Sequence, residues 1–373
     1  MLGKTPPMGF NTWNTFSENF NDELIKEIAD AMVERGFKDA GYEYVIIDDH
    51  WEMDERDPET GMILPRPQKF KNQDIKSLVD YVHNKGLKMG IYTCAGVVTC
   101  GQRAASYNHE FFDAKVFADW GIDYVKHDYC QKPETQDGRV LMRRMGLALR
   151  ESGRDIIYAA CSWGQNDVWS WIRSTGAHMY RSTADIFDSF GMISKIYNSQ
   201  IDKLGTSAPY CYNDIDMLTV GMCGKGAAGA GSGCTEGEYR IQFCIWCMYS
   251  APLILGCDVR KVSDEYRDLL CNKTLIRINQ DPEARPPFPI GGMDRTIYLK
   301  QLVNNEYALL FVNTGDEARK SSFISYDMGW TENSGYKIQL TDVFTGEVSY
   351  HKNIVSANVP AHDCRMFIMK LVK

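Results

Sequence analysis

The chain has 373 residues, of which 44% are hydrophobic and 24% are charged, so it can bury a large core, which argues against disorder. Its formal net charge is -8 and no stretch concentrates lysine and arginine, which argues against a nucleic-acid partner. No segment approaches the roughly 18 uncharged apolar residues of a membrane span, and the first residues lack the pattern of a secretory signal. We therefore expect a cytoplasmic protein without membrane contact, with a secreted mature form as the alternative.

Short runs of strand-forming residues alternate with amphipathic segments up to about residue 282, which is typical of repeated βα units. The expected strands are 8–13, 42–49, 87–93, 123–128, 155–162, 179–185, 210–217 and 252–259. Helical periodicity marks 22–37, 75–86, 111–121, 139–153 and 238–250. Eight strands with intervening helices match the size of an α/β fold of the (β/α)8 TIM barrel type, so we predict a catalytic barrel over 1–282.

The character of the sequence changes after residue 282, where four prolines lie between Pro282 and Pro289. A stretch this rich in proline indicates a linker. Beyond it, polar and apolar residues alternate at period two in 296–303, 307–315, 321–328, 336–350 and 364–372. We predict a small antiparallel β domain over 286–373.

The twelve cysteines are too sparse in a chain of this length for a disulfide scaffold. Cys244 and Cys247 form a CxxC pair inside an apolar helical segment, and no second CxxC or histidine pair follows at zinc-finger spacing. Core packing is therefore the favoured interpretation of this pair over metal binding.

Polar and aromatic residues gather at the carboxyl ends of the expected strands. A parallel barrel brings these ends to one mouth, where the loops that follow the strands converge. In chain order the ends carry Trp13, Asp48, Asp49, Tyr92, Lys126, Asp128, Ser162, Trp163, Arg181, Asp185, Asp214 and Asp216.

This set of side chains limits the chemistry of the mouth. Hard cations prefer oxygen ligands without a competing positive charge, and here Lys126 and Arg181 stand beside carboxylates, so we predict no metal and no cofactor. Carbohydrate chemistry fits better, because carboxylates accept hydrogen bonds from sugar hydroxyls and tryptophan stacks on the apolar face of a sugar ring. Two further carboxyls can then serve as acid and nucleophile.

Each of these residues also has a purely structural interpretation. Asp48 and Asp49 could cap a helix. Asp214 and Asp216 could form loop-stabilising Asx turns. The tryptophan could belong to the core, and Lys126 could pair with a buried carboxylate that has no role in binding. The coincidence of all of them at one end of a barrel favours a binding site.

An ordered set of motifs runs through the expected barrel: "TPPMGFNTWN", "YVIIDDHW", "GLKMGIYTCAG", "FADWGIDYVKHDYC", "YRSTADI", "NDIDML", "APLILGCDV" and "INQDP". With these motifs the chain resembles glycoside hydrolase family 27, the melibiase family of α-galactosidases and α-N-acetylgalactosaminidases. The resemblance implies a TIM barrel followed by a C-terminal antiparallel β-sandwich. It also implies a retaining release of terminal α-linked D-galactose from oligosaccharides or glycoconjugates, with no cofactor. A homo-oligomer is possible, and the resemblance leaves the oligomeric state open.

The resemblance further implies that Asp128 and Asp185 are the catalytic pair. Asp128 stands in a K-x-D-x-C motif with Lys126 and Cys130 and is expected to be the nucleophile. Asp185 follows Arg181 by four residues, which is the position of the acid/base. Lys126 is expected to lower the pKa of Asp128 and to donate to a sugar hydroxyl.

The substrate contacts carry over in the same way. Asp48 and Asp49 are expected to hold the hydroxyls at the O4 and O6 end of the sugar, and Trp13 to form an aromatic wall. The other implied contacts are Tyr92, Lys126, Ser162, Gln165, Arg181, Asp216 and Met217. Two alternatives fit less well: a β-L-arabinopyranosidase usually replaces an acid of the 48–49 pair, and a non-catalytic sugar-binding barrel would lack one catalytic carboxylate.

The residues expected near the 2-position of the sugar point in two directions. Ser162 is the small residue that accompanies an N-acetyl group in the α-N-acetylgalactosaminidases of the family. Gln165, however, is larger than the residue that such a pocket usually has. An α-galactosidase is therefore favoured, acting on an α-galactoside, with an enzyme for α-N-acetylgalactosaminides as the alternative.

The cysteines also leave two interpretations open. Cys100 and Cys130 match positions that form a disulfide beside the nucleophile in secreted members of the family. Cys161 matches another paired position, but the region of its usual partner holds no cysteine. A missing signal and many free thiols favour a reduced compartment, in which the 100–130 bond would not form.

Overall fold

The first part of the chain folds into a ring of parallel strands. In the computed structural model, which describes residues 2–290 and 295–373, one parallel sheet has eight strands, in the order β7-β6-β5-β4-β3-β2-β1-β8. They are β1 (Met8–Asn11), β2 (Tyr44–Ile46), β3 (Lys88–Cys94), β4 (Tyr124–Asp128), β5 (Ile157–Cys161), β6 (Met179–Arg181), β7 (Tyr212–Asp214) and β8 (Leu253–Leu255). A parallel bridge from Leu218, just after β7, to Leu255 joins the two ends of the sheet. The predicted TIM barrel is confirmed.

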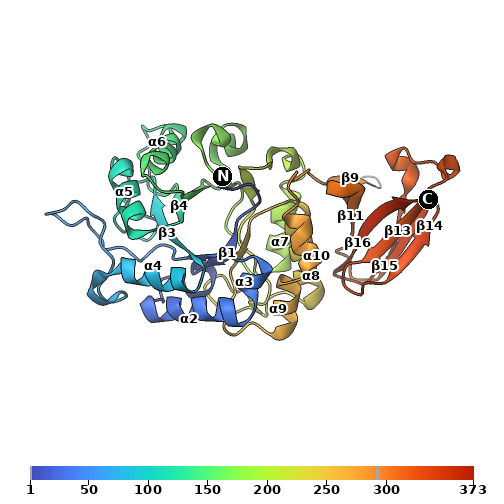
Figure 1. Cartoon of the computed structure of the whole chain (residues 1–373), viewed down its shortest axis with the longest axis horizontal. Coiled ribbons are helices and arrows are strands. Elements are labelled where there is room, and N and C mark those ends of the chain that lie inside the picture. The colour runs from blue at the N-terminus through green and yellow to red at the C-terminus, as the bar shows by residue number, and fades with distance from the viewer. Residues whose placement is uncertain (1, 291–294) are drawn as a thin grey trace.

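Helices surround this barrel (Figure 1). They are α1 (Trp13–Phe16), α2 (Asp22–Glu34), α3 (Phe37–Ala40), α4 (Ile75–Asn84), α5 (Glu110–Trp120), α6 (Gly138–Glu151), α7 (Phe190–Asn198), α8 (Glu236–Met248), α9 (Asp264–Leu270) and α10 (Lys273–Asn279). Side-chain caps set several starts: Asn21 accepts from the N–H of Leu24, and Thr235 forms a capping box with Glu238. Among the described residues, no helix combines the length and apolar character needed to cross a bilayer.

Most barrel strands are shorter than the sequence predicts, and in β1, β2, β6, β7 and β8 the larger part of the difference lies at the carboxyl end. The expected strand 42–49 stops at Ile46, and the expected strand 210–217 stops at Asp214. Beyond these points the backbone leaves the strand ladder: the N–H of Asp48 donates to Oγ1 of Thr12, and Asp216 has a φ of 83°. Asp48 and Asp216 therefore belong to turns that begin where their strands end.

Alternate residues of each barrel strand face two different cores. Inside the ring, one cluster packs Tyr44, Ile46, Tyr124, Ile157, Ala159, Met179, Tyr212, Met217 and Ile254. The residues between them, such as Val45, Val125 and Tyr158, pack outward under the helices. Cys244 and Cys247 of α8 are free and fully buried in this outer cluster, where they pack in the core as predicted.

The C-terminal part forms two packed antiparallel sheets (Figure 1). Among the described residues, the larger sheet has the order β14-β13-β16-β11-β10-β9 and the smaller one pairs β12 with β15. The bounds are β9 (Phe288–Ile290), β10 (Ile297–Gln301), β11 (Glu306–Asn313), β12 (Arg319–Ile324), β13 (Lys337–Asp342), β14 (Val348–His351), β15 (Ile354–Val359) and β16 (Asp363–Val372). Apolar residues such as Leu299, Phe323 and Val355 fill the space between the sheets. The predicted antiparallel β-sandwich is confirmed.

The pattern of this domain differs from the prediction in three places. Strand β15 lies outside the predicted strand runs. The expected strand 336–350 is a hairpin of β13 and β14, and the expected linker contains the edge strand β9. Pro289 fits there, because proline is tolerated on the edge of a sheet.

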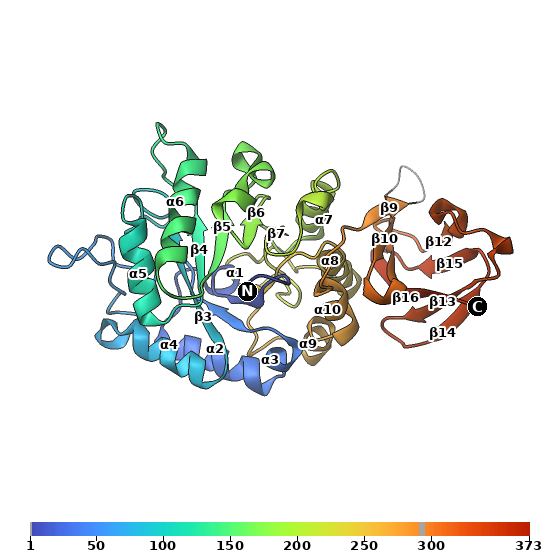
Figure 2. The same ribbon diagram turned by 45° about the horizontal axis from the view of Figure 1, so that its top comes forward.

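Arg240 of α8 donates to both carboxylate oxygens of Asp363 at 2.7 and 2.6 Å and so joins the barrel to β16. Figure 2 shows α8 and α10 on the side of the barrel that faces the sandwich. The domain limits 1–282 and 286–373 stay predictions.

Candidate active site

A cavity of about 330 Å³ opens at the carboxyl ends of the barrel strands, a size suited to a small ligand. All of the predicted site residues except Ser162 and Gln165 line it. Those that do are Trp13, Asp48, Asp49, Tyr92, Lys126, Asp128, Arg181, Asp185, Asp216 and Met217. The barrel thus brings together side chains from six of its strand ends, from β1 to β7, as the sequence predicts.

Lys126 is a mostly buried cation at the end of β4. Its Nζ donates to Oδ2 of Asp48 at 2.8 Å, and the same oxygen accepts from Nδ2 of Asn11 at 2.7 Å. Nζ also lies 5.2 Å from the centre of the Tyr92 ring. Burial disfavours the ammonium, but Asp48 and Asp128 outweigh it and raise the pKa of Lys126 well above its ordinary value. Lys126 therefore pairs with a buried carboxylate and lines the cavity at the same time.

Asp128 lies on the floor of the cavity, with 5% of its surface exposed. The N–H of Tyr129 donates to its Oδ1 at 2.9 Å, and the hydroxyl of Tyr92 donates to its Oδ2 at 3.2 Å. Burial raises the pKa of Asp128, and the Lys126 ammonium and the Tyr129 N–H oppose the rise. Lys126 thus acts on the pKa of Asp128 in the expected direction, and burial outweighs its effect.

Asp49 is held by the loop that follows β3. Oγ1 of Thr99 donates to its Oδ1 at 2.8 Å, and the N–H of Gly101 donates to its Oδ2 at 2.7 Å. The N–H of the next residue, His50, donates to Oδ1 at 2.7 Å. The His50 ring stacks on Trp13 with 6.1 Å between ring centres and 6° between planes. One loop thus orients both an acceptor of hydroxyl groups and the support of an aromatic wall.

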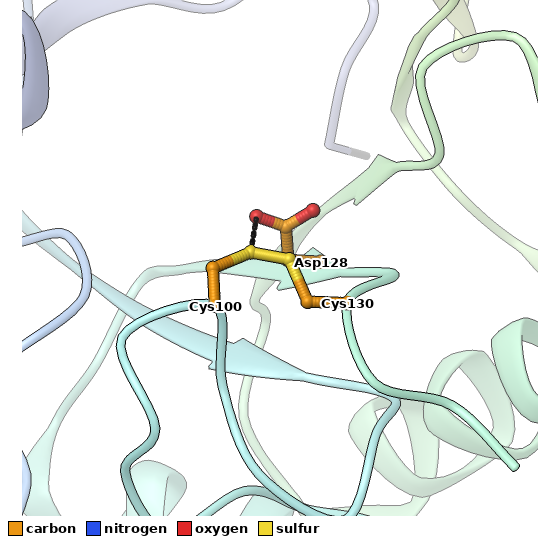
Figure 3. Close-up of side chains that lie close together, drawn as sticks. All are labelled: Cys100, Asp128 and Cys130. Carbon is orange, nitrogen blue, oxygen red and sulfur yellow. Dashed lines mark hydrogen bonds between the residues drawn. A yellow bond between two sulfur atoms is a disulfide. The ribbon is translucent and has the colours of Figure 1, made fainter.

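Cys100 and Cys130 form a disulfide beside Asp128 (Figure 3). Sγ of Cys100 lies 3.8 Å from Oδ2 of Asp128, in a contact that has no proton because a disulfide sulfur carries none. The two loops also meet at Gly96, where an added Cβ would lie 2.0 Å from the carbonyl oxygen of Cys130. The disulfide interpretation of this pair is confirmed. Cys161 is free, in line with its missing partner.

A second set of charges lies across the cavity, around Arg181. Its Nη2 donates to Oδ1 of Asp185 at 2.8 Å and pairs with Oδ2 of Asp216 at 2.5 Å. The N–H of Ile186 donates to Oδ2 of Asp216 at 2.6 Å. Burial raises the pKa of Asp216 to about 6, and Arg181 opposes the rise. The side chain of Asp185 is 64% exposed, so this carboxylate lies nearer the solvent than Asp128.

Asp214 is the residue of the strand-end set whose structural interpretation holds. Its Oδ1 accepts the N–H of Asp216 at 2.9 Å, which is the bond of an Asx turn. Asp214 does not line the cavity, whereas Asp216 does. The turn places Asp216 against Arg181.

The fifth strand end departs from the sequence-based assignment. Ser162 is fully buried outside the cavity lining, with no hydrogen-bond partner for its hydroxyl among the described residues, and Gln165 is exposed. Their neighbours Cys161 and Trp163 line the cavity instead. The reason is the alternation of side chains along β5: Ile157 and Ala159 face the barrel interior, so Cys161 does as well and Ser162 faces away.

Other lining residues carry no signal that sequence reasoning could detect. They are Asn14, Ser17, Ile186, Phe187, Ala227 and Ala228. The two alanines lie in the long loop between β7 and α8, and their N–H groups donate to the carbonyls of Thr15 and Asn14. This loop therefore folds back over the end of β1, through a contact that no local pattern encodes.

Some residues at or beside the cavity have unusual backbone conformations. His50, Trp163 and Asp216 have φ values of 74°, 51° and 83°, in the region that favours glycine. Strain of this kind persists where the surrounding structure holds it in place, and it clusters at functional sites.

A barrel with buried cations, paired carboxylates and aromatic walls at its strand ends defines a carbohydrate-processing protein.

Comparison with known proteins gives the family. Residues 5–281 match the family described as Alpha galactosidase A, and residues 293–369 match the Alpha galactosidase C-terminal beta sandwich domain. The chain is 37% identical to Alpha-galactosidase A of Cellvibrio japonicus, across 97% of this chain and 91% of the relative. It is 36% identical to Alpha-galactosidase of Cyamopsis tetragonoloba, across 99% of this chain and 87% of the relative.

A solved structure agrees with these relatives. The crystal structure of alpha-galactosidase I from Mortierella vinacea superposes with a TM-score of 0.90 at 32% identity, covering 99% of this chain and 97% of the other. The chain belongs to the α-galactosidase, or melibiase, family, glycoside hydrolase family 27.

The Lys126–Asp48 pair leads to a prediction about stability. Asp48→Ala leaves a buried ammonium without its partner, so we expect the free energy of unfolding to fall by about 3–5 kcal/mol, measured by chemical denaturation. Adding Lys126→Met should recover part of the loss. Asp80→Ala, which breaks a surface pair with Lys76, is the matched control and should have a far smaller effect. An unchanged stability in Asp48→Ala would contradict the assignment of this pair.

Proposed function

We propose that this chain is a retaining α-galactosidase that removes terminal α-linked D-galactose from oligosaccharides or glycoconjugates. The observation that carries the proposal is that Asp128 and Asp185 line one cavity together with acceptors and donors for sugar hydroxyls. The chain also belongs to the α-galactosidase family. Relatives with the name alpha-galactosidase match it over most of their own length.

In the first step of the proposed reaction, Asp128 attacks the anomeric carbon of the bound galactose. A bond forms between that carbon and a carboxylate oxygen of Asp128, and the bond to the glycosidic oxygen breaks. The proton of Asp185 goes to the departing oxygen, so the aglycone leaves as an alcohol. The sugar then remains as a covalent ester of inverted configuration.

In the second step, Asp185 is a carboxylate and takes a proton from an incoming water. The water oxygen attacks the anomeric carbon while the ester bond to Asp128 breaks. Two inversions give overall retention. Asp128 and Asp185 are both regenerated in their starting forms.

The positions of the two carboxylates suit these roles. Asp128 is buried on the floor, where its orientation is held by Tyr92 and the N–H of Tyr129, as a nucleophile requires. Asp185 is far more exposed and pairs with Arg181 near the mouth, where the leaving group departs and water enters. Lys126 offsets part of the burial that raises the pKa of Asp128, so it favours the ionised nucleophile.

The proposed sugar contacts follow from the same geometry. Asp48 and Asp49 are fixed acceptors for the O4 and O6 hydroxyls, and Trp13 with its His50 stack is a wall for the apolar face of the ring. A sugar without net charge suits this site, because the cations of Lys126 and Arg181 are already paired with carboxylates.

The choice between galactose and N-acetylgalactosamine is tested directly. We expect the chain to hydrolyse an aryl α-galactoside and to act far more weakly on the matching aryl α-N-acetylgalactosaminide, measured by kcat/KM for aryl release. An aryl β-L-arabinopyranoside serves as a control, because it lacks the group that the 48–49 pair is expected to hold. A higher kcat/KM for the N-acetyl substrate would replace the proposed substrate with the alternative.

The nucleophile is tested by removal and chemical rescue. Asp128→Ala should abolish turnover, and azide should restore part of it, because a small anion fits the space that the carboxylate leaves. A single displacement by azide would yield β-galactosyl azide, which product analysis by NMR identifies. Asp128→Asn is the matched control, since its amide fills the space and should not be rescued. Turnover close to that of the parent chain would rule out Asp128 as nucleophile.

The acid/base role is tested through the leaving group. Asp185→Ala should lower kcat/KM by about 10²–10⁴-fold for an alkyl α-galactoside, whose alcohol needs a proton to depart. A dinitrophenyl α-galactoside should lose far less in this first step, because its leaving group departs as an anion. Equal losses for both substrates would remove Asp185 from the acid role. Arg181, which pairs with Asp185, is not substituted in this comparison.

A further inference from the structure

Phe187 is a large apolar side chain at the rim of the cavity, two residues after Asp185. It is 51% exposed and lines the cavity. Among the described residues, no other large hydrophobic side chain with this degree of exposure takes part in the lining. The proposed galactose contacts do not include this exposed aromatic ring at the mouth of the polar cavity.

The exposure of Phe187 does not come from a loose loop, because the backbone is held on both sides. The N–H of Ile186 donates to Oδ2 of Asp216 at 2.6 Å. On the other side, the N–H of Asp188 donates to the carbonyl of Ala228 at 2.8 Å. The Asp188 carboxylate is fully buried and accepts from the hydroxyl of Tyr239 at 2.9 Å. The chain therefore presents the ring from a fixed segment.

The place of this ring along the path of the substrate follows from the two carboxylates. The sugar-binding groups Asp48 and Asp128 are buried on the floor, at 1% and 5% exposure. Asp185 is 64% exposed, and the proposed acid must contact the glycosidic oxygen. The group attached to that oxygen then extends from Asp185 toward solvent. Phe187, two residues after Asp185, is the solvent-exposed large apolar side chain of the described cavity lining.

Other residues of the cavity lining also bear on such a group. Trp163 gives a second aromatic ring to the lining, and Ala227 and Ala228 have small side chains. The N–H groups of the two alanines donate to carbonyls in the segment after β1, so this wall is fixed as well. Exposed aromatic surface together with small side chains suits a ring that stacks.

We propose that Phe187 forms a binding site for the aglycone and selects α-galactosides whose leaving group presents a flat apolar face, such as a second pyranose ring. This inference rests on the proposed function, because it takes Asp185 as the acid that contacts the glycosidic oxygen. The ring adds affinity for the leaving-group side and leaves the galactose contacts unchanged.

The test compares two substrates that share galactose and differ in the leaving group. Phe187→Ala should lower kcat/KM for melibiose, in which galactose is α-linked to glucose, by about tenfold through a higher KM, as expected for the loss of one aromatic stack. α-Galactosyl fluoride has no ring to stack, so its kcat/KM should stay within about twofold of the parent value.

Two further variants serve as controls. Phe187→Tyr keeps an aromatic face and should retain the parent preference for melibiose. Phe111→Ala removes a ring of similar exposure on α5, outside the cavity, and should change neither substrate. The inhibition constant for galactose should be the same in Phe187→Ala and the parent chain, because galactose occupies the floor only.

The outcomes separate this inference from the function on which it rests. Equal losses for melibiose and α-galactosyl fluoride, or unchanged values for both, would overturn the aglycone site while the α-galactosidase function stands. A parent chain that does not turn over α-galactosyl fluoride would overturn the proposed function and the aglycone site together. A loss confined to melibiose and reversed by Phe187→Tyr supports the proposal.

Discussion

The buried ammonium of Lys126 is the interaction on which the arrangement of the cavity depends. A cation in this position is stable only with a carboxylate close by, and Asp48 supplies it at 2.8 Å. Asp48 follows β2 and Lys126 lies in β4. These strands are separated in the sheet by β3, so the contact passes across the end of β3 and its Tyr92. The same ammonium lowers the cost of ionising Asp128. One charge thus links the residue that holds the sugar to the residue that attacks it.

The floor and the rim of the cavity differ in how they are built. The floor comes from strand ends, whose positions are set by the hydrogen-bond ladders of the barrel and by the 100–130 disulfide. The rim comes from longer loops that hold each other through buried polar contacts such as Asp188 with Tyr239. A rigid floor suits recognition of one sugar, and a rim built from loops can differ in the leaving group that it accepts.

Much of this could be predicted because a parallel barrel turns a one-dimensional pattern into a spatial one. Residues that end successive strands must meet at one mouth, so the order of strands along the chain is enough to place Asp48, Asp128 and Asp185 together. The motif shows the neighbouring cation that lowers the pKa of Asp128, as predicted, but it does not show the degree of burial that raises this pKa. Ser162 shows another limit: the sequence does not reveal which of two successive residues at the end of β5 faces the barrel interior.

The sequence by itself determined the class of fold, the family and the two carboxylates proposed for catalysis, because strand periodicity and ordered motifs are local properties. Only the tertiary structure decided that Lys126 pairs with Asp48, that Cys161 and not Ser162 lines the cavity, and that Phe187 stands at the rim. These facts depend on contacts between segments far apart in the chain, and on how deeply each group is buried. Neither of these can be read from residues that are neighbours in sequence.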